Sequence, residues 1–458
     1  MSKKSGSLIE RLKASGHKKV KVAVTDIDGV LRGKYMHIDK CISALEAKDN
    51  TPAGFGFCNV VFGWDCADLC YDNSTYSGWH TGYPDATVVL DESTYRTIPW
   101  EDNLPFLLGS FIGDDGKPLA VCPRSLLISA QDELVAMGFD VKAGFEFEWF
   151  NFVESAHSLE AKNYLDPKPL TPGMHGYSIL RSAQNAPYFH ALVDQLEAFN
   201  VSLEGLHTET GPGVYEAAIA ASGALEAADK AVLFKAATKQ IAHEFAIVPS
   251  FMARWHDTLP GCSGHIHQSL IKDGKPCFFD AKSPTGMSKL FESYLAGIIY
   301  CLPDVLPCFA PTINSYKRLV EGYWAPTRAN WGIDNRTVAM RVISGSPKSM
   351  RLEARVGGAD LNPYLALAAC LKAGAYGVAN KLELKDPAIT GNGYESKNGQ
   401  KLSGNLFEAA SKMQTSKLAR KLFGDAFIDH FSASRMWEWR QFNAAVTNWE
   451  MKRYFEII

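Results

Sequence analysis

The stretch NSYKRLVEGYWAPTRANWGIDNRTVAMRVISGSPKSMRLEAR, residues 314–355, is rich in arginine and ends in the pattern Arg-x-Glu-x-Arg. Residues two apart on a strand share a face, so the side chains of Arg351, Glu353 and Arg355 are expected to project together. The planar guanidinium of arginine offers a fork of donors that matches carboxylate and phosphate oxygens. The pattern therefore indicates an anionic ligand, with the glutamate left to bind a cation. On its own, it is also typical of a solvated strand of salt bridges.

The length and composition of the chain favour a soluble protein of two domains. Its 458 residues exceed one ordinary domain, and 46% hydrophobic with 21% charged residues is typical of a globular protein with a sizeable core. The net charge of -3 gives no electrostatic reason to expect binding to nucleic acid or to an anionic membrane. Ten cysteines without a C-x-x-C pair indicate reduced thiols, and not a disulfide framework or a zinc site.

No targeting or membrane-spanning segment is expected. The start, MSKKSGSLIERLKASGHKK, is basic, but the apolar segment of a signal peptide does not follow it. The longest apolar candidate, near residues 297–310, is interrupted by Pro303, Asp304 and Pro307. The sequence therefore predicts a cytoplasmic protein.

The first part of the chain predicts a small β-rich domain. Residues 19–25 and 30–37 read as strands that flank an Asp-Gly turn signal. The segment Gly-Asp-Asp-Gly-Lys-Pro at residues 113–118 reads as a domain junction. We expect an N-terminal domain over residues 15–115 and a larger domain over residues 120–458.

The same region raises an alternative, because a strand followed by Asp26-Ile-Asp28-Gly is also how haloacid-dehalogenase phosphatases begin, with the first aspartate as nucleophile. Residues 424–429, Gly-Asp-Ala-Phe-Ile-Asp, resemble the metal-binding motif of that family. However, residues 417–423 before them read as an amphipathic helix, whereas that motif needs a buried strand. The phosphatase is therefore a remote alternative.

Residues 143–150, Ala-Gly-Phe-Glu-Phe-Glu-Trp-Phe, carry the first strong signal of the larger domain. The aromatic side chains alternate with those of Glu146 and Glu148, so one face of a strand is apolar and the other carries two carboxylates. Like charges at this spacing repel, and a functional face needs a cation between them. A strand that is exposed on one side is the alternative for this segment alone.

Two further segments carry paired polar side chains. Glu209 and Glu216 flank a Gly-Pro-Gly turn, which brings both carboxylates towards one point. His265 and His267 share one face of an expected strand, although satisfied structural histidines are commoner than metal ligands. Together with Glu353 and the 146/148 pair, these residues form a set of carboxylates and imidazoles that is stable when buried only around divalent cations.

Mostly oxygen ligands favour Mg²⁺ or Mn²⁺ over Zn²⁺. Cations beside arginines are typical of a phosphoryl-transfer site, where positioning and charge neutralisation supply most of the catalysis. The G-x-x-x-x-G-K-[ST] motif is absent, so a P-loop enzyme is excluded.

From about residue 19 onward the chain resembles the glutamine synthetase family, the glutamate–ammonia and glutamate–amine ligases of nitrogen metabolism. The motifs that carry the resemblance are E-x-E, E-x₆-E around a glycine turn, H-x-H-Q-S, N-S-Y-K-R-L, D-N-R, and R-x-E-x-R followed by N-P-Y. The resemblance implies an α+β architecture: a β-grasp N-terminal domain and an α/β catalytic domain with a curved, mostly antiparallel sheet. It also implies a homo-oligomeric ring, a dodecamer, with active sites between neighbouring subunits.

The resemblance further implies roles for individual residues. One metal ion would be held by Glu148, Glu209 and Glu216, and a second by Glu146, His265 and Glu353. The substrate glutamate would bind to Arg318, Arg355 and the Gly261 backbone. Phosphate would bind to Arg336, Arg341 and Arg351, with Arg336 and Arg341 as catalytic residues. ATP would also contact Glu204, His267, Ser269 and Lys348.

The implied reaction has two steps: the γ-carboxylate of glutamate attacks ATP to give γ-glutamyl phosphate and ADP, and an amine then displaces phosphate. A flap must exclude water, which would hydrolyse the acyl phosphate. The retained metal positions argue against a non-enzymatic, structural relative.

The sequence departs from the family pattern where the acceptor would bind. The flap motif G-Y-E-A-P is Gly-Tyr-Trp324-Ala-Pro here, the usual G-Q-x-E is Gly-Val-Tyr-Glu, and the F-D-G-S-S loop is missing, with Asp65 as a loose counterpart. Loss of the flap glutamate removes a partner for ammonium. We therefore expect a ligase of glutamate and a small primary amine, with Trp324 at the acceptor and Asp65 as base; a glutamine synthetase that uses ammonia is the alternative.

Overall fold

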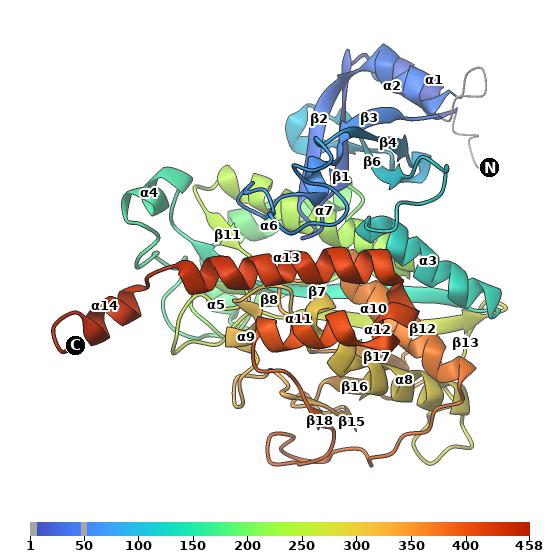
Figure 1. Ribbon diagram of the computed structural model, residues 1–458, viewed down its shortest axis with the longest axis vertical. Helices are drawn as coiled ribbons and strands as arrows, with labels where there is room; N and C mark the ends of the chain where they lie inside the picture. Colours follow the sequence, from blue (N-terminus) through green and yellow to red (C-terminus); the bar gives the residue numbers. More distant parts are fainter. Residues whose placement is uncertain (1–6, 47–52) are drawn as a thin grey trace.

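The computed structural model describes residues 7–46 and 53–458, which form two β-sheets with helices around them (Figure 1). The first six residues of the basic start, and residues 47–52 of the expected N-terminal domain, lie outside this part. Within it, no helix is both long and apolar enough to cross a membrane.

The smaller sheet has the strand order β2-β1-β6-β4-β3, with β5 paired to β6. Its strands are β1 (Lys19–Thr25), β2 (Leu31–His37), β3 (Phe55–Cys58), β4 (Asp85–Leu90), β5 (Arg96–Ile98) and β6 (Leu104–Ile112). Its helices are α1 (Leu8–Ala14) and α2 (Ile38–Leu45), with 3₁₀ turns η1 (Asn59–Phe62), η2 (Glu92–Thr94) and η3 (Pro99–Glu101). The two strands predicted from the sequence are confirmed as an antiparallel pair.

The larger sheet has the order β15-β16-β17-β12-β7-β9-β8, and all these pairings are antiparallel except β15 with β16. Its strands are β7 (Asp140–Phe152), β8 (Leu203–Thr208), β9 (Val214–Ile219), β10 (Ser222–Gly223), β11 (Val248–Ser250), β12 (Gly264–Lys272), β13 (Lys275–Pro276), β15 (Trp331–Ile333), β16 (Met340–Ile343) and β17 (Arg351–Ala354). A separate pair joins β14 (Arg328–Ala329) to β18 (Gln400–Lys401).

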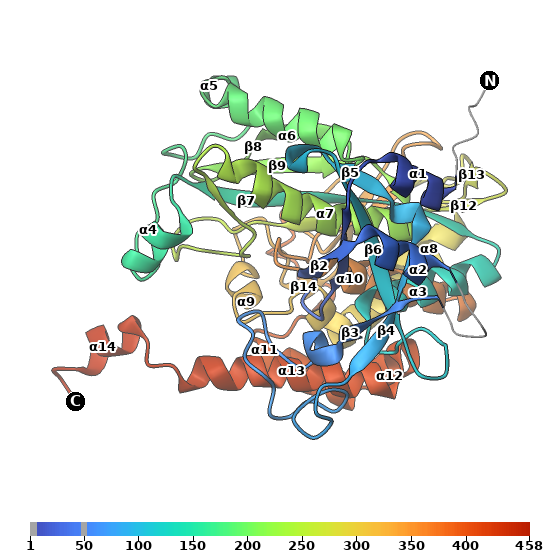
Figure 2. The same cartoon turned by 90° about the horizontal axis from the view of Figure 1, so that it is seen from above.

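Helices surround the larger sheet (Figures 1 and 2). They are α3 (Pro123–Ala136), α4 (Ala156–Ala161), α5 (Ile179–Gln184), α6 (Ala186–Ala198), α7 (Ala224–His243), α8 (Lys289–Val305), α9 (Ser315–Arg318), α10 (Pro363–Ala379), α11 (Leu406–Thr415), α12 (Lys417–Phe423), α13 (Asp425–Ala444) and α14 (Asn448–Tyr454), with the 3₁₀ turn η4 (Leu306–Cys308). Helix α14 projects away from the body.

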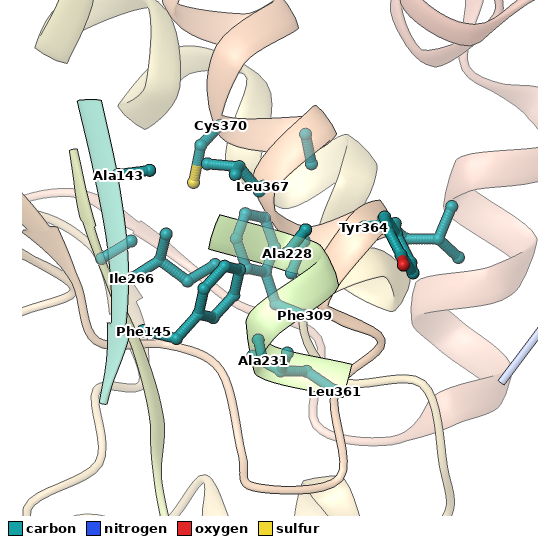
Figure 3. Close-up of a cluster of buried hydrophobic side chains, with 14 of the residues drawn as sticks. Ala143, Phe145, Ala228, Ala231, Ile266, Phe309, Leu361, Tyr364, Leu367 and Cys370 are labelled. Carbon is teal, nitrogen blue, oxygen red and sulfur yellow. The ribbon is translucent and has the colours of Figure 1, made fainter. Parts of the chain in front are cut away.

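The apolar face of the larger sheet is buried against α7 and α10. Figure 3 shows Phe145 of β7 and Ile266 of β12 facing Ala228 and Ala231 of α7, with Leu367 of α10 beside them. All five side chains are buried, and the alternation of β7 turns Phe145, Phe147 and Trp149 to this side. The opposite face of the same strands is left for polar side chains.

The phosphatase alternative is wrong in its structural premise. Residues 417–423 form helix α12, as the sequence predicted, and Asp425 and Asp429 lie on α13, where both accept hydrogen bonds from Arg420 at 2.8 and 2.6 Å. No buried strand precedes them. Asp26 in turn accepts from Arg32, so the candidate nucleophile is held in an ion pair.

Candidate active site

The polar face of the larger sheet collects charged residues from neighbouring strands because of their register. Glu146 of β7 stands opposite His265 of β12, and Glu148 stands opposite Glu216 of β9. Glu353 of β17 stands opposite His267 and also opposite Arg341 of β16. Cross-strand neighbours on one face are close enough for their side chains to meet.

Glu146, His265 and Glu353 form the inner cluster, whose candidate ligand atoms all lie within 4.8 Å of one another. The Nδ1 atom of His265 lies 3.0 Å from Glu146 Oε1 and 3.4 Å from Glu353 Oε1. Glu353, which is 1% exposed, also accepts from Arg341 Nη1 at 3.0 Å and from Arg355 Nη1. The structure thus brings together the three residues that the family resemblance assigns to the second metal ion.

His207, Glu209 and Glu216 form the outer cluster, again with ligand atoms within 4.8 Å. The sequence pattern indicated Glu148 for this set and did not indicate His207. Glu148 Oε2 accepts a hydrogen bond from the backbone N–H of Ser263 at 2.8 Å, which turns this oxygen towards β12. The pattern His-x-Glu at residues 207–209 carried the same two-residue spacing as the other pairs and would have identified the histidine.

The electrostatics of both clusters fit divalent cations. Burial raises the pKa of Glu216 to about 10, reinforced by Glu146 and Glu148, so this carboxylate is not ionised at neutral pH without a cation. Burial opposes ionisation of Glu353 too, but His265 and Arg355 hold its pKa at about 2.

Three buried atoms that face these clusters have no hydrogen-bond partner within the described residues: His207 Nε2, Glu209 Oε2 and His265 Nε2. Each cluster offers two carboxylates and one imidazole, and a ligand set of mostly oxygen atoms suits Mg²⁺ or Mn²⁺. The residues present therefore fit the implied ions.

The arginines of residues 314–355 lie in different environments. Arg318 is 2% exposed and donates to Ser263 Oγ at 2.8 Å and to the Val356 carbonyl at 3.1 Å, and burial lowers its pKa. Arg351 Nε lies 3.2 Å from His267 Nδ1. Arg336, by contrast, is exposed, in the turn between β15 and β16.

The remaining nucleotide positions lie at the edge of this face. Glu204 is exposed at an irregularity in the pairing of β8 with β9, and Lys348 is exposed before β17. Ser269 follows His267 on β12, with a buried hydroxyl that has no partner among the described residues. Gly261 has no space for a side chain, because a Cβ atom there would lie 2.2 Å from the Ala253 carbonyl oxygen.

The two acceptor candidates are not brought together within one chain. Trp324 lies in the loop after α9, 54% exposed and with a positive φ of 58°. Asp65 lies in the N-terminal region, where its Oδ2 accepts from Trp437 Nε1 of α13 at 3.2 Å. The sequence analysis also missed Tyr177, whose ring stacks on His207 at a centroid distance of 4.4 Å. It lies in a loop without a periodic pattern, so no sequence signal marked it.

Comparison with known proteins agrees with this geometry. A family model for the glutamine synthetase catalytic domain matches residues 120–454. The chain is 51% identical to type-1 glutamine synthetase 2 of Dictyostelium discoideum, over 98% of this chain and 86% of that protein. It is 35% identical to the glutamate–isopropylamine ligase of a Pseudomonas species, over 96% and 95% of the two chains.

The solved GmaS/ADP complex in its conformation 1 superposes with a TM-score of 0.84, at 22% identity, over 99% of this chain and 100% of that chain. At this identity the likeness concerns the fold, and it confirms the expected mixed α/β architecture with a curled sheet.

Fold and site together define a ligase that forms carbon–nitrogen bonds with the use of ATP. The chain belongs to the glutamine synthetase family, and it is a glutamate–ammonia or glutamate–amine ligase.

Proposed function

We propose that this enzyme joins the γ-carboxyl group of glutamate to a small primary amine by way of γ-glutamyl phosphate. The observation that carries the proposal is the contrast between complete inner and outer clusters and a flap that carries Trp324 in place of a carboxylate. The 35% identity to a glutamate–isopropylamine ligase supports it. The 51% identity to a glutamine synthetase supports the second candidate, in which the acceptor is ammonia.

In the proposed site the two clusters hold Mg²⁺ or Mn²⁺, with Glu148 completing the outer set. Bound there, the ions would neutralise charge on the ATP phosphates and on the transferring phosphoryl group. Arg336 and Arg341 stabilise the same developing charge, while Arg351, Glu204, His267, Ser269 and Lys348 position the nucleotide. Support for these positions comes from the register that sets Arg341 and His267 against Glu353.

The substrate glutamate is proposed to bind Arg318, Arg355 and the Gly261 backbone. Arg318 and Arg355 adjoin one another, since Arg318 Nη2 lies 3.3 Å from the Arg355 carbonyl oxygen. A pair of buried guanidinium groups at one place suits a carboxylate, because the ligand charge offsets their loss of water.

At the acceptor, Trp324 is proposed to offer an apolar ring to the alkyl part of the amine and a π-face to its cationic end. Asp65 of a neighbouring subunit is proposed as the base that removes the proton before attack. An active site shared between subunits accounts for the separation of Asp65 from the two clusters within one chain.

The proposal also includes the domain organisation and the assembly of the chains. The N-terminal domain, residues 15–115, is a β-grasp domain, and residues 120–458 form the catalytic domain. The chains assemble as a dodecameric ring in the cytoplasm. The mixed sheet with a parallel β1–β6 pairing supports the β-grasp assignment.

The test is an ADP-release assay with glutamate, ATP and Mg²⁺ or Mn²⁺ across a panel of amines that includes methylamine, ethylamine, isopropylamine, ethanolamine and ammonia. The expected result is a higher kcat/KM for one small primary amine than for ammonia, with the γ-glutamyl amide identified by mass spectrometry. Ammonia ahead of every amine by a wide margin would make the protein a glutamine synthetase with an unusual flap.

A further inference from the structure

A cavity of about 450 Å³ lies away from the polar face of the larger sheet. Its walls come from η2 and β5 of the smaller sheet, from α3, and from the first turns of α7. β5 lies close to α7 in Figure 2, and residues of both elements line the cavity. A volume of this size suits a small metabolite.

Arg96 of β5 lines this cavity and has no role in the proposed reaction. Its side chain is 7% exposed. Nε donates to the Thr94 carbonyl at 3.0 Å, and the guanidinium carbon lies 5.5 Å from the centre of the Phe199 ring. Nη1 has no hydrogen-bond partner, and no carboxylate of residues 7–46 and 53–458 lies within 4.0 Å of the guanidinium.

Asp229 of α7 is the carboxylate that most favours the charge of Arg96, but both of its oxygens accept hydrogen bonds from other groups. Arg124 donates to Oδ1 at 2.9 Å and to Oδ2 at 2.8 Å, and Tyr364 donates to Oδ1 at 2.6 Å. Burial lowers the pKa of Arg96, and Asp229 only partly offsets this effect. A buried guanidinium without a bound anion costs free energy, which an anionic ligand would recover.

Two other features of the cavity also favour a negatively charged ligand. Lys230 adds a second cation, in an ion pair of 2.9 Å with Glu226, whose own side chain is largely exposed. Helix α7 begins at the cavity with Gly223 at its N-cap, where no side chain caps the helix. The partial positive charge of a helix N-terminus attracts anions, although here Gln131 already accepts from the N–H of Leu225.

We propose that this cavity is a binding site for a small organic anion, and that Arg96 binds the carboxylate or phosphate group of that ligand. The site is separate from the two metal clusters and does not depend on which amine the enzyme uses. Its ligand would bridge the smaller sheet and α7, the helix whose Phe234 stacks on Phe147 of β7 at 6.1 Å.

The test is isothermal titration calorimetry of the whole protein with two probes, inorganic phosphate and succinate. Mg²⁺, a non-hydrolysable ATP analogue that carries a γ-phosphate, and glutamate are present at saturation, so that the proposed anion positions of the active site are filled. Arg96→Gln removes the charge at the cavity, and Arg181→Gln, on exposed helix α5, is the matched control. We expect binding of at least one probe, weakened at least about tenfold in Arg96→Gln and unchanged in the control.

The probes distinguish the ligand classes: succinate alone indicates a dicarboxylate, phosphate alone a phosphate-bearing metabolite, and either result supports the site. If Arg96→Gln does not fold, Arg96→Lys replaces it, because lysine keeps the charge and loses the planar fork. No binding of either probe by the wild-type protein, or an affinity that the Arg96 substitution leaves unchanged, would overturn the proposal.

Discussion

The inner cluster and the loop that carries Trp324 are built from different kinds of backbone. Glu146, His265 and Glu353 lie on adjacent strands whose register sets their distances, and each is backed by the apolar face of the same sheet. Trp324 lies in a loop, exposed and with φ of 58°, a conformation that bulky residues rarely adopt. Rigid strands suit groups that must hold charge in place, whereas a loop accepts substitution without disturbing them.

This difference separates the parts of the reaction. Under the proposed function, the residues that bind metal and phosphate are fixed by sheet register, and the choice of acceptor is left to loops. Substitutions on the strands should therefore abolish phosphoryl transfer, while substitutions on the flap should redirect it.

The largest effect is expected for Glu353→Gln in the inner cluster. The change removes one negative charge between Arg341, Arg355 and His265 while it keeps the side-chain shape. ADP release should fall by about 10³-fold at saturating Mg²⁺ or Mn²⁺. Circular dichroism and thermal unfolding check that the variant is folded, and Glu160→Gln, an exposed position on α4, is the control. Near-normal turnover by Glu353→Gln, or by wild-type protein in excess EDTA, would contradict the metal assignment.

The next largest effect is expected for the arginines, and it should divide between two kinetic constants. Arg336→Ala should lower kcat by about 10³-fold with little change in the KM for glutamate, since arginines at transferring phosphoryl groups act in the transition state. Arg318→Lys should mainly raise that KM, because lysine keeps the charge but loses the fork. Steady-state kinetics with glutamate as the varied substrate distinguishes them. The reverse pattern would show that the two roles are exchanged.

A smaller effect is expected on the flap. Trp324→Glu should shift the ratio of kcat/KM for ammonia over the preferred amine upward by about tenfold, because a carboxylate pairs with ammonium and the apolar ring is lost. Trp324→Phe is the matched control, since it keeps an aromatic face. Competition between ammonia and the amine, with both products measured by mass spectrometry, gives the ratio directly. An unchanged ratio in Trp324→Glu would remove the flap from the account of acceptor choice.

The smallest effect on activity is expected outside both regions, at Asn362. Its Oδ1 caps helix α10 by accepting from the N–H of Tyr364 at 3.0 Å, and its Nδ2 donates to the Ile27 carbonyl at 3.0 Å. Asn362→Ala should lower the free energy of unfolding by about 1–2 kcal/mol, measured by urea denaturation, and leave kcat/KM of the folded protein nearly unchanged. Asn405→Ala, which removes the cap of α11 and an exposed hydrogen bond to the Glu408 side chain, is the comparison. A larger loss from Asn405→Ala would mean that the Ile27 contact adds no stability.

The part of the site that lies on strands could be predicted from the sequence, because side chains two residues apart on a strand lie on one face in any fold. This logic paired Glu146 with Glu148 and His265 with His267, and it would also have paired His207 with Glu209, whereas the family resemblance was needed to group Glu146 with His265 and Glu353. The positions of Tyr177 and Asp65 could not be predicted in this way, because the position of a loop depends on packing and on neighbouring chains. The same holds for Arg96, which lacks a carboxylate partner because Asp229 pairs with Arg124.

The turn between β1 and β2 has a consequence for how the chain folds. Ile27 is bonded to Asn362, 335 residues further on, and Asp28 to Arg435, 407 residues further on, at 2.6 Å. A ribosome therefore releases the smaller sheet long before either partner exists. Contacts between such distant positions carry a high entropic cost and form slowly. The smaller sheet has its own buried cluster of apolar side chains and can form first, whereas its docking through Ile27 and Asp28 must wait until α10 and α13 have been synthesised.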